Sequence, residues 1–440
     1  NGDDKADERK VLFTGWSTGD THAGPSNLNY GLDNWIYGMV GYSGFAGTVG
    51  DEKQSFRTGF YRMKSDGSKI EFLRNTNNNS WGVGLSEEGL LFGSTANGNP
   101  SVHLPIPNRY YEKVRGWSSS VLEGIAGSAP IHPITKQIRQ VDHHDKFTAA
   151  AGHALYTARN YPSDYWNKTA FVTEPTGHLV ATFPITPEGA SFTSRNAFNL
   201  VASDDEWSSP IVAEVGPDGN VWVIDWYNFI VQHNPTPAGF KTGKGNAYET
   251  NLRDKKHGRI YRLVHKEGKN SAYVNLTTAD SSKLVETLRN DNFFWRRHAQ
   301  RLLVEKQSKG AIPALIELAK ETKIDGAGLT PCVIHALWTL KGLGALEEEN
   351  SPATKVAIAA LTHASAGVRL NALKVLPLKA SSIDAILKAN LLGDTNAQVQ
   401  LATLLALSDM PPSEQSSKAI AQMLKSPKRP LDKWLLDGVT

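Results

Sequence analysis

Short stretches in which apolar and polar residues alternate run through the first 265 residues, separated by turn residues. The clearest lies in Asp20–Gly44, where an alternating run leads to a second strand over Trp35–Val40. The residues between them, Gly31–Asn34, predict a tight hairpin turn. The unit returns where Pro217-Asp218-Gly219 precedes Val221–Asp225, since Pro fixes φ and Gly accepts positive φ in such turns. Self-similar strand pairs predict the blades of a β-propeller.

From Ser281 onward the apolar residues recur three and four positions apart, which predicts helices. Four segments align without gaps, and their shared positions are Ala299, Ala336, Ala372 and Ala402. The intervals are 336 − 299 = 37, 372 − 336 = 36 and 402 − 372 = 30 residues, close to the period of HEAT repeats. Alanine at each crossing would let paired helices approach closely. An ordinary helical bundle is the alternative.

These two patterns predict a multidomain chain, all-β and then all-α. We expect a partial β-propeller over residues 1–265, a linker over 266–280 and a HEAT-like α-solenoid over 281–440. Stacked helical repeats commonly expose an extended surface that can bind a protein partner.

Composition narrows the possible functions. The net charge is +3, with 47 basic and 44 acidic residues, so nothing favours nucleic acid as a partner. The single cysteine, Cys332, excludes an intrachain disulfide and any CxxC metal or haem motif. No apolar run has the length of a transmembrane helix.

The histidine of the first strand pair, His22, is the main candidate for chemistry. It stands among small residues just before a predicted inner strand, the place from which a propeller presents polar groups to its central channel. A histidine there can act as a general base. The other interpretation is a buried histidine bonded to nearby backbone.

Two other clusters resemble metal sites. Asn1–Asp7 resembles a shortened calcium loop, but an acidic, frayed terminus explains it equally well. His143, His144 and Asp145 lie in an irregular stretch, residues 101–147. Adjacent side chains on a strand point to opposite faces, so we expect a solvated loop there and assign no metal ligand.

Four motifs carry a resemblance to a known family. Residues 11–265 resemble the six-bladed propellers of the glucose/sorbosone dehydrogenase type, soluble quinoproteins that use pyrroloquinoline quinone. More closely, the chain resembles the PVC-type membrane-bound dehydrogenase family, in which such a propeller precedes HEAT-like helices and often a c-type cytochrome. The motifs are THAGPSNLNYGLDNWIYGMVGYSG, FYRMKSDGSKIEFLRN, LYTARNYPSDYWNKTAFVTEPTGHLV and VGPDGNVWVIDWYN.

The resemblance implies an oxidoreductase that acts on sugar or polyol hydroxyls and passes electrons to a quinone or to a downstream haem domain. It implies that His22 is catalytic and that Arg74 and Asn75 bind the cofactor. A tricarboxylate quinone needs such guanidinium and amide donors. Calcium is implied with the quinone, and haem c would require a further domain. Arg74 could instead brace the Asn-rich loop that follows it.

The sequence departs from the family pattern at several site positions. Pro175 stands where a cofactor-contacting lysine is expected, and Ser209 where the family usually has arginine. The aspartate that normally orients the catalytic histidine would fall near Gly41-Tyr42 and is absent. We therefore predict weak or no binding of pyrroloquinoline quinone.

The resemblance also bears on location and extent. It implies an exported or periplasmic protein, and it leads us to expect that the first blades of the six-bladed ring lie upstream of Asn1. The alternative function is a non-catalytic propeller and HEAT protein that binds a glycan or a protein partner.

Overall fold

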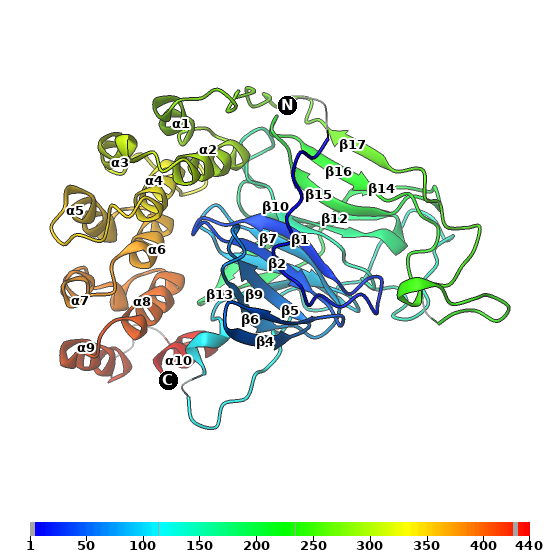
Figure 1. The fold of residues 1–440 in the computed structure, drawn as a ribbon, viewed down its shortest axis with the longest axis horizontal. Helices are drawn as coiled ribbons and strands as arrows, with labels where there is room; N and C mark the ends of the chain where they lie inside the picture. Colours follow the sequence, from blue (N-terminus) through cyan, green and yellow to red (C-terminus); the bar gives the residue numbers. More distant parts are fainter. Residues whose placement is uncertain (1–4, 113, 234, 426–429) are drawn as a thin grey trace.

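The computed structural model describes residues 5–112, 114–233, 235–425 and 430–440. Antiparallel sheets occupy the N-terminal part and helices the C-terminal part, and they lie side by side (Figure 1). The chain is thus all-β and then all-α, as expected. Residues 1–4 of the expected calcium-type loop lie outside the described residues. No helix in these ranges is long and apolar enough to cross a membrane.

The described strands form four propeller-like sheets and one two-stranded ribbon. Blades of four strands each were expected, but the sheets contain four, three, five and three strands, because strand pairing depends on partners distant in sequence. The first sheet contains β1 (Pro25–Tyr30), β2 (Ile36–Val40), β5 (Gly59–Met63) and β6 (Ile70–Asn75), and β3 (Phe45–Val49) with β4 (Glu52–Phe56) forms the ribbon. The second contains β7 (Ser80–Leu85), β8 (Leu91–Thr95) and β9 (Asn99–Leu104). The third contains β10 (His153–Leu155), β11 (Thr169–Glu174), β12 (Leu179–Glu188), β13 (Ser191–Ser194) and β14 (Phe198–Ala202), and the fourth β15 (Pro210–Val215), β16 (Val221–Asp225) and β17 (Arg259–Leu263).

The strands and turns read from the sequence are confirmed where the local pattern was strong. β1 and β2 pair antiparallel around the expected turn, which the hydrogen bond from Gly31 N to Trp35 O closes at 2.8 Å. Gly219 has a φ of +79°, as the Pro-Asp-Gly turn requires, and it leads into β16.

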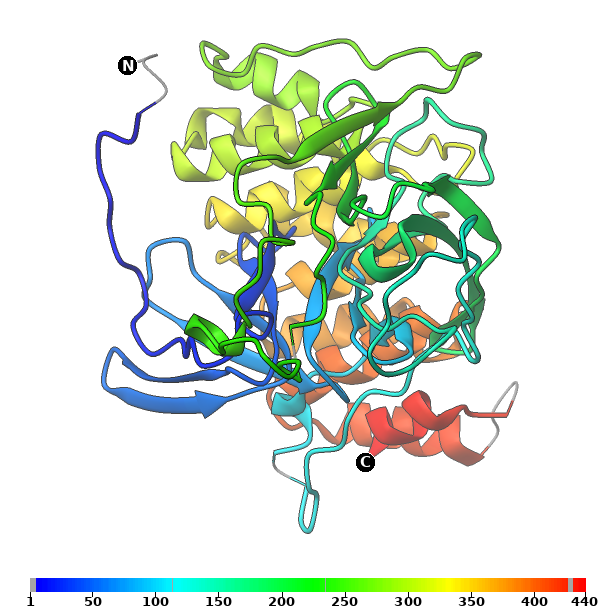
Figure 2. The ribbon, with the colours of Figure 1, turned by 90° about the vertical axis from the view of Figure 1, so that its right-hand side faces the viewer.

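The described helices form two layers beside the sheets. The layer nearer the sheets contains α2 (Phe293–Glu305), α4 (Pro331–Gly342), α6 (Ala366–Val375) and α8 (Ala397–Asp409), and α10 (Lys433–Val439) packs on α8. The outer layer contains α1 (Ser281–Thr287), α3 (Ile312–Leu318), α5 (Pro352–Ala359), α7 (Ala380–Lys388) and α9 (Glu414–Lys425). Seen from the sheet side, the helices form a continuous backing (Figure 2).

The four aligned alanines lie on corresponding helices. Ala299, Ala336, Ala372 and Ala402 occupy α2, α4, α6 and α8, and all four are buried. Successive helices of this layer contact one another. The spacing therefore corresponds to one structural unit per repeat, while assignment to the HEAT class stays a prediction.

One hydrophobic core joins the helices to the first two sheets. Met39, Leu85 and Leu104 belong to the same buried cluster as Leu337 and Leu373 of the helices. Residues 265–280 between the two parts form neither helix nor strand. The expected linker over 266–280 lies in this irregular stretch, and its role as a boundary between two domains stays a prediction, since the parts on either side share a core.

Candidate functional site

His22 lies in the loop before β1, where its own neighbours fix its backbone. Its amide donates to Asp20 Oδ1 at 2.8 Å, a turn that aspartate commonly makes two residues before an amide. Its carbonyl accepts a hydrogen bond from the indole of Trp81, on β7 of the next sheet. Gly41 N, at the end of β2, donates to Ala23 O at 3.1 Å. The first two sheets therefore hold this loop in place together.

A second histidine faces His22 from a distant part of the chain. The Nδ1 atoms of His22 and His233 lie 2.5 Å apart, and His233 Nε2 lies 3.4 Å from Asp20 Oδ1. His233 lies in the connection between β16 and β17 of the fourth sheet. A later part of the same connection also reaches this loop, where Thr21 N donates to Gly245 O at 3.0 Å. The first and last sheets thus meet at His22.

The polar contacts of this cluster favour one arrangement of protons. His233 Nε2 lies 3.4 Å from Asp20 Oδ1 and makes no hydrogen bond to it. Because a carboxylate only accepts, its nearness favours the tautomer in which His233 Nε2 carries the proton. His233 Nδ1 is then the acceptor of the histidine pair, and His22 Nδ1 is the donor. His22 Nε2 is left with a free lone pair, and this buried atom has no hydrogen-bond partner among the described residues.

The surroundings keep His22 neutral near pH 7. The pKa of its imidazole is lowered to about 4, mainly by burial and also by His233 and Arg253, while Asp20 opposes the shift. Burial also lowers the pKa of His233. A neutral imidazole with a free nitrogen can accept a proton from a bound hydroxyl.

Two indole rings border His22. The ring centroid of Trp81 lies 6.3 Å and that of Trp226 6.1 Å from the imidazole centroid, both edge to face. Arg253 adds a cation near them; its Nε donates to Tyr248 O at 2.9 Å, while its buried Nη2 has no partner in the described chain. The surroundings of His22 thus bring together a base, the aromatic surface of two indole rings and a guanidinium group with one unpartnered nitrogen.

The other two expected site residues lie across the sheet. Arg74 and Asn75 end β6, which is the opposite edge strand from β1. Backbone hydrogen bonds connect Ala23, Gly41, Thr58 and Thr76 in turn, from one edge of the sheet to the other. These three steps between neighbouring strands separate the His22 loop from the end of β6 by about 14 Å. No contact among the described residues joins His22 to Arg74 or Asn75. Their shared site therefore stays a prediction without a contact to support it.

Arg74 and Asn75 are engaged by the loop that follows the second sheet. Arg74 is 3% exposed, its Nη2 donates to Ser120 Oγ at 2.8 Å, and its guanidinium lies 4.6 Å from the ring centroid of Tyr111. Asn75 Oδ1 accepts from Ser119. Arg74 thus braces a loop, although a different one from the Asn-rich loop considered in the sequence.

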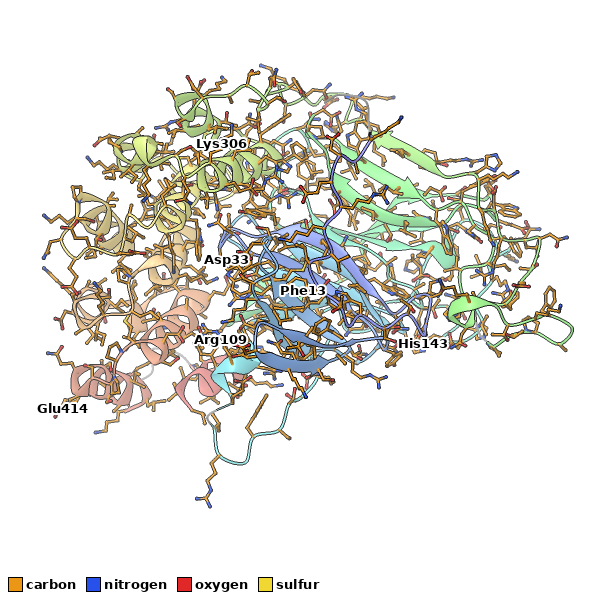
Figure 3. All side chains as sticks on the ribbon, in the orientation of Figure 1. Phe13, Asp33, Arg109, His143, Lys306 and Glu414 are labelled. Carbon is orange, nitrogen blue, oxygen red and sulfur yellow. The ribbon has the colours of Figure 1, made fainter. Side chains whose placement is uncertain are left out.

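Asp20, His22 and His233 could hold a metal ion. One ligand atom from each lies within 4.8 Å of the others. Among the described residues, these three form the one cluster of histidine, cysteine or acidic side chains with the spacing of a metal site. Two imidazoles and one carboxylate suit zinc, iron or copper. Calcium prefers oxygen ligands, so this set does not fit the calcium that the resemblance implies. His143 and His144 are exposed, as expected. His143 lies on the side of the sheets away from the helices (Figure 3).

The residues present do not fit pyrroloquinoline quinone in the way the resemblance implies. Arg74 Nη2 and Asn75 Oδ1 are bound to the Ser119–Ser120 loop, and the other guanidinium nitrogens of Arg74 are buried, where no ligand surface reaches them. Beside His22 the cation is Arg253. We therefore derive no step of the reaction through this cofactor.

Sequence reasoning found His22 but missed its partners. Asp20 is two residues away, and the Asp-x-His spacing was a usable signal for it. His233 is 211 residues from His22, in a segment without a motif, so nothing local could have identified it. Trp81 was visible only as one of many aromatic residues.

A family model described as "Domain of unknown function (DUF7133)" matches residues 1–267. No curated protein matches the sequence. Among solved structures, a glucose dehydrogenase aligns with 16% identity and a TM-score of 0.33, over 51% of this chain and 67% of that one. The PQQ-bound aldose sugar dehydrogenase of Streptomyces coelicolor gives 14% and 0.29, over 52% and 60%. The apo soluble aldose sugar dehydrogenase of Escherichia coli gives 14% and 0.29, over 46% and 60%.

Proposed function

The chain belongs to the family defined by DUF7133, and because that description carries no activity, we propose a function from the His22 cluster itself. The protein is an oxidoreductase that acts on a hydroxyl group of a sugar or polyol, and His22 Nε2 accepts the hydroxyl proton. The observation that carries the proposal is this buried, unpartnered Nε2 of an imidazole whose Nδ1 meets His233 Nδ1, with Asp20 Oδ1 3.4 Å from His233 Nε2.

The cluster supplies both orientation and charge compensation. When His22 Nε2 takes a proton, the imidazole becomes a cation, and the hydrogen bond to His233 spreads that charge toward Asp20. The same contacts fix the ring in one tautomer before substrate binds, as an orienting carboxylate does for a catalytic histidine. Asp20 and His233 are therefore positioning residues, and they occupy the role of the aspartate absent near Gly41-Tyr42.

The aromatic rings and the resemblance favour a sugar or polyol as substrate. Trp81 and Trp226 border His22, and indole rings offer apolar faces together with a polar tip. The oxidation removes one proton to His22 and two electrons with the hydrogen on the carbinol carbon. The carbinol hydrogen leaves with both electrons as hydride to an acceptor of the quinone or dye class from outside this cluster. The reduced acceptor can then release its protons and pass the electrons singly to a downstream haem domain of the kind that the resemblance implies.

A non-catalytic sugar-binding role is the second candidate. It is favoured by the position of Arg74 and Asn75, whose contacts are with the Ser119–Ser120 loop and not with His22. In that role the free Nε2 of His22 would accept a hydrogen bond from a sugar hydroxyl without removing its proton.

The proposals for the cellular location and the binding partners of the protein rest on the same resemblance. We propose an exported or periplasmic protein, and a protein partner for the outer surface of the helices if they are HEAT repeats. Both rest on the sequence motifs, and a fractionation of the source cells with an antibody to the protein tests the location.

Replacing His22 with glutamine should abolish most of the proposed activity. We expect the protein to oxidise at least one sugar or polyol with an electron-accepting dye, and the variant to lower kcat/KM about 100-fold, the usual contribution of a general base. His144→Gln, at an exposed histidine outside the cluster, should leave kcat/KM unchanged. The assay is run with and without added pyrroloquinoline quinone and calcium.

Other outcomes of this assay separate the two candidates. Sugar binding by calorimetry without dye reduction, with binding weakened by His22→Gln, would establish the recognition role in place of the enzyme. Neither binding nor dye reduction would contradict both. Activity that depends on sub-micromolar pyrroloquinoline quinone would show that the protein does bind this cofactor, contrary to the contacts of Arg74 and Asn75.

A further inference from the structure

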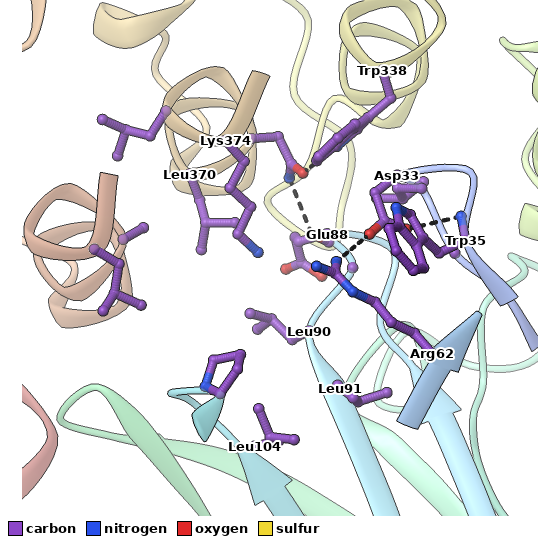
Figure 4. A pocket seen from close by; sticks show the side chains of 18 of the residues that line it. Asp33, Trp35, Arg62, Glu88, Leu90, Leu91, Leu104, Trp338, Leu370 and Lys374 are labelled. Carbon is purple, nitrogen blue, oxygen red and sulfur yellow. Dashed lines mark hydrogen bonds and ion pairs between the residues drawn. The ribbon is translucent and has the colours of Figure 1, made fainter. Parts of the chain in front are cut away.

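A large cavity lies between the sheets and the inner helices, away from the His22 cluster. Its volume is about 730 Å³, which is within the range of sites for small molecules. The hairpin turn after β1, the ends of β7 to β9 and one face of α4, α6 and α8 line it. None of His22, Arg74 and Asn75 lines it. Figure 4 shows the cavity from close by.

The cavity has an extensive apolar wall. Leucines from both parts of the molecule project into it, among them Leu90, Leu91 and Leu104 from the sheets and Leu370 and Leu401 from the helices. In the shared core such side chains are otherwise packed on one another. Here they surround open space, where an apolar group would release water and gain contacts.

The polar side of the cavity is cationic. Lys374 of α6 extends its ammonium group into the space, toward Glu88 in the close-up view of Figure 4. It has no hydrogen bond or ion pair among the described residues, although its backbone carbonyl accepts from Lys341 Nζ at 2.6 Å. Lys374 is exposed to the water that fills the cavity, and an anion bound there would pair with its free ammonium group.

The neighbouring charges already have partners. Arg62 is paired with Asp33 at 2.8 Å and with Glu71 at 2.6 Å. Glu88 accepts a hydrogen bond from Asn167 Nδ2 at 2.6 Å. Lys64 also lines the cavity, and its ammonium lies 4.3 Å from the ring centroid of Trp35. Lys374 has neither an aromatic ring nor a protein acceptor at its ammonium in the described chain, so it is the cation that a bound anion would meet.

We propose that this cavity binds an amphipathic anion, a small molecule with a carboxylate or similar head group on Lys374 Nζ and an apolar body against the leucine wall. The ammonium supplies a charge-assisted hydrogen bond to the head group. The apolar wall supplies most of the binding free energy through burial. This site does not depend on the function proposed for His22.

The ionisation of Lys374 agrees with this role. Burial lowers the pKa of its amine to about 8, Asp33 and Glu88 oppose the shift, and Arg62 adds to it. The group is therefore still largely a cation near pH 7. A bound carboxylate should raise this pKa, since an opposite charge favours the ionised form.

Calorimetric titration of the whole protein with decanoate tests the proposal. We expect one decanoate per chain, and Lys374→Met should weaken its binding at least tenfold because methionine keeps the apolar stem and removes the charge. Lys374→Arg should restore part of the affinity. Lys355→Met, at an exposed lysine of the outer helix α5, should leave it unchanged.

Two further measurements keep the proposal open to refutation if Lys374→Met changes the fold. Leu370→Trp, which fills the cavity, should abolish decanoate binding, and decyltrimethylammonium should not bind to the unaltered protein. The proposal is overturned if decanoate does not bind, if it binds equally well to Lys374→Met and Leu370→Trp, or if the cationic analogue binds as tightly.

Discussion

Replacing Glu87 with alanine is expected to lower the free energy of unfolding by about 3–5 kcal/mol, the cost of removing one partner from a buried ion pair. Glu87 is fully buried after β7. One carboxylate oxygen accepts from Arg159 Nη1 at 2.7 Å, and the other accepts from Arg159 Nη2 at 3.1 Å and from Arg296 Nη2. Without this carboxylate, two guanidinium groups would face each other inside the protein.

The effect should be large because these residues join parts of the chain that are distant in sequence. Arg296 is 1% exposed and belongs to α2. Arg159 follows β10, and its Nη2 also pairs with Asp325 at 2.6 Å, in the loop before α4. Glu87 therefore connects the second sheet, the third sheet and the helices at one point.

Urea unfolding at pH 7 measures this prediction. Glu87→Gln should cost less than Glu87→Ala, because the amide keeps some hydrogen bonds. Glu317→Ala is the matched control, since Glu317 pairs with Lys320 on the surface, where such pairs contribute little. Equal losses for Glu87→Ala and Glu317→Ala would show that the buried network contributes no more than a surface pair.

The elements with strong local patterns could be predicted from the sequence. The Pro-Asp-Gly turn gave β16 its start, because its φ requirements are local. The alanine spacing identified α2, α4, α6 and α8 because helix packing repeats with the chain. The unequal strand numbers of the sheets and the core shared with the helices depend on contacts between distant segments, and no periodicity records those.

The candidate site shows the same division. His22 was found from its motif, and Asp20 lies beside it in the chain. His233 approaches from the connection between β16 and β17, and only the folded chain brings it to His22. Arg74 and Asn75 were assigned by resemblance alone, and a resemblance does not show that the Ser119–Ser120 loop binds Arg74 Nη2 and Asn75 Oδ1.

The second large effect is a loss of folding stability at acidic pH. Two histidines inside the sheets, His103 and His153, each make one hydrogen bond to a serine hydroxyl at 3.0 Å, and the other ring nitrogen of each is buried without a partner in the described chain. Burial lowers the pKa of both to about 3, and Lys374 adds to the shift at His103. Both are therefore neutral in the folded protein at all but acidic pH.

Another buried group acts in the opposite direction. Burial raises the pKa of Glu174 to about 7, so the folded state takes up its proton before the unfolded state does, and acid favours folding at this position. The total pH dependence of stability is a sum of such terms. Comparison of a histidine variant with the unaltered protein at two pH values isolates the histidine contribution, because Glu174 is common to both.

Acidification should therefore destabilise the protein through His103 and His153. In the unfolded chain these histidines bind protons below their ordinary pKa of 6.5, while the folded protein resists protonation until about pH 3. The contribution to stability is complete above pH 6.5 and is lost as pH falls, by about 2–3 kcal/mol for each histidine at pH 4.5. Urea unfolding at pH 7.5 and 4.5 should show a loss smaller by about that amount in His153→Gln than in the unaltered protein. The exposed His144→Gln variant should follow the unaltered protein at both pH values. If His153→Gln has the same pH dependence as the unaltered protein, His153 is not held neutral by its burial.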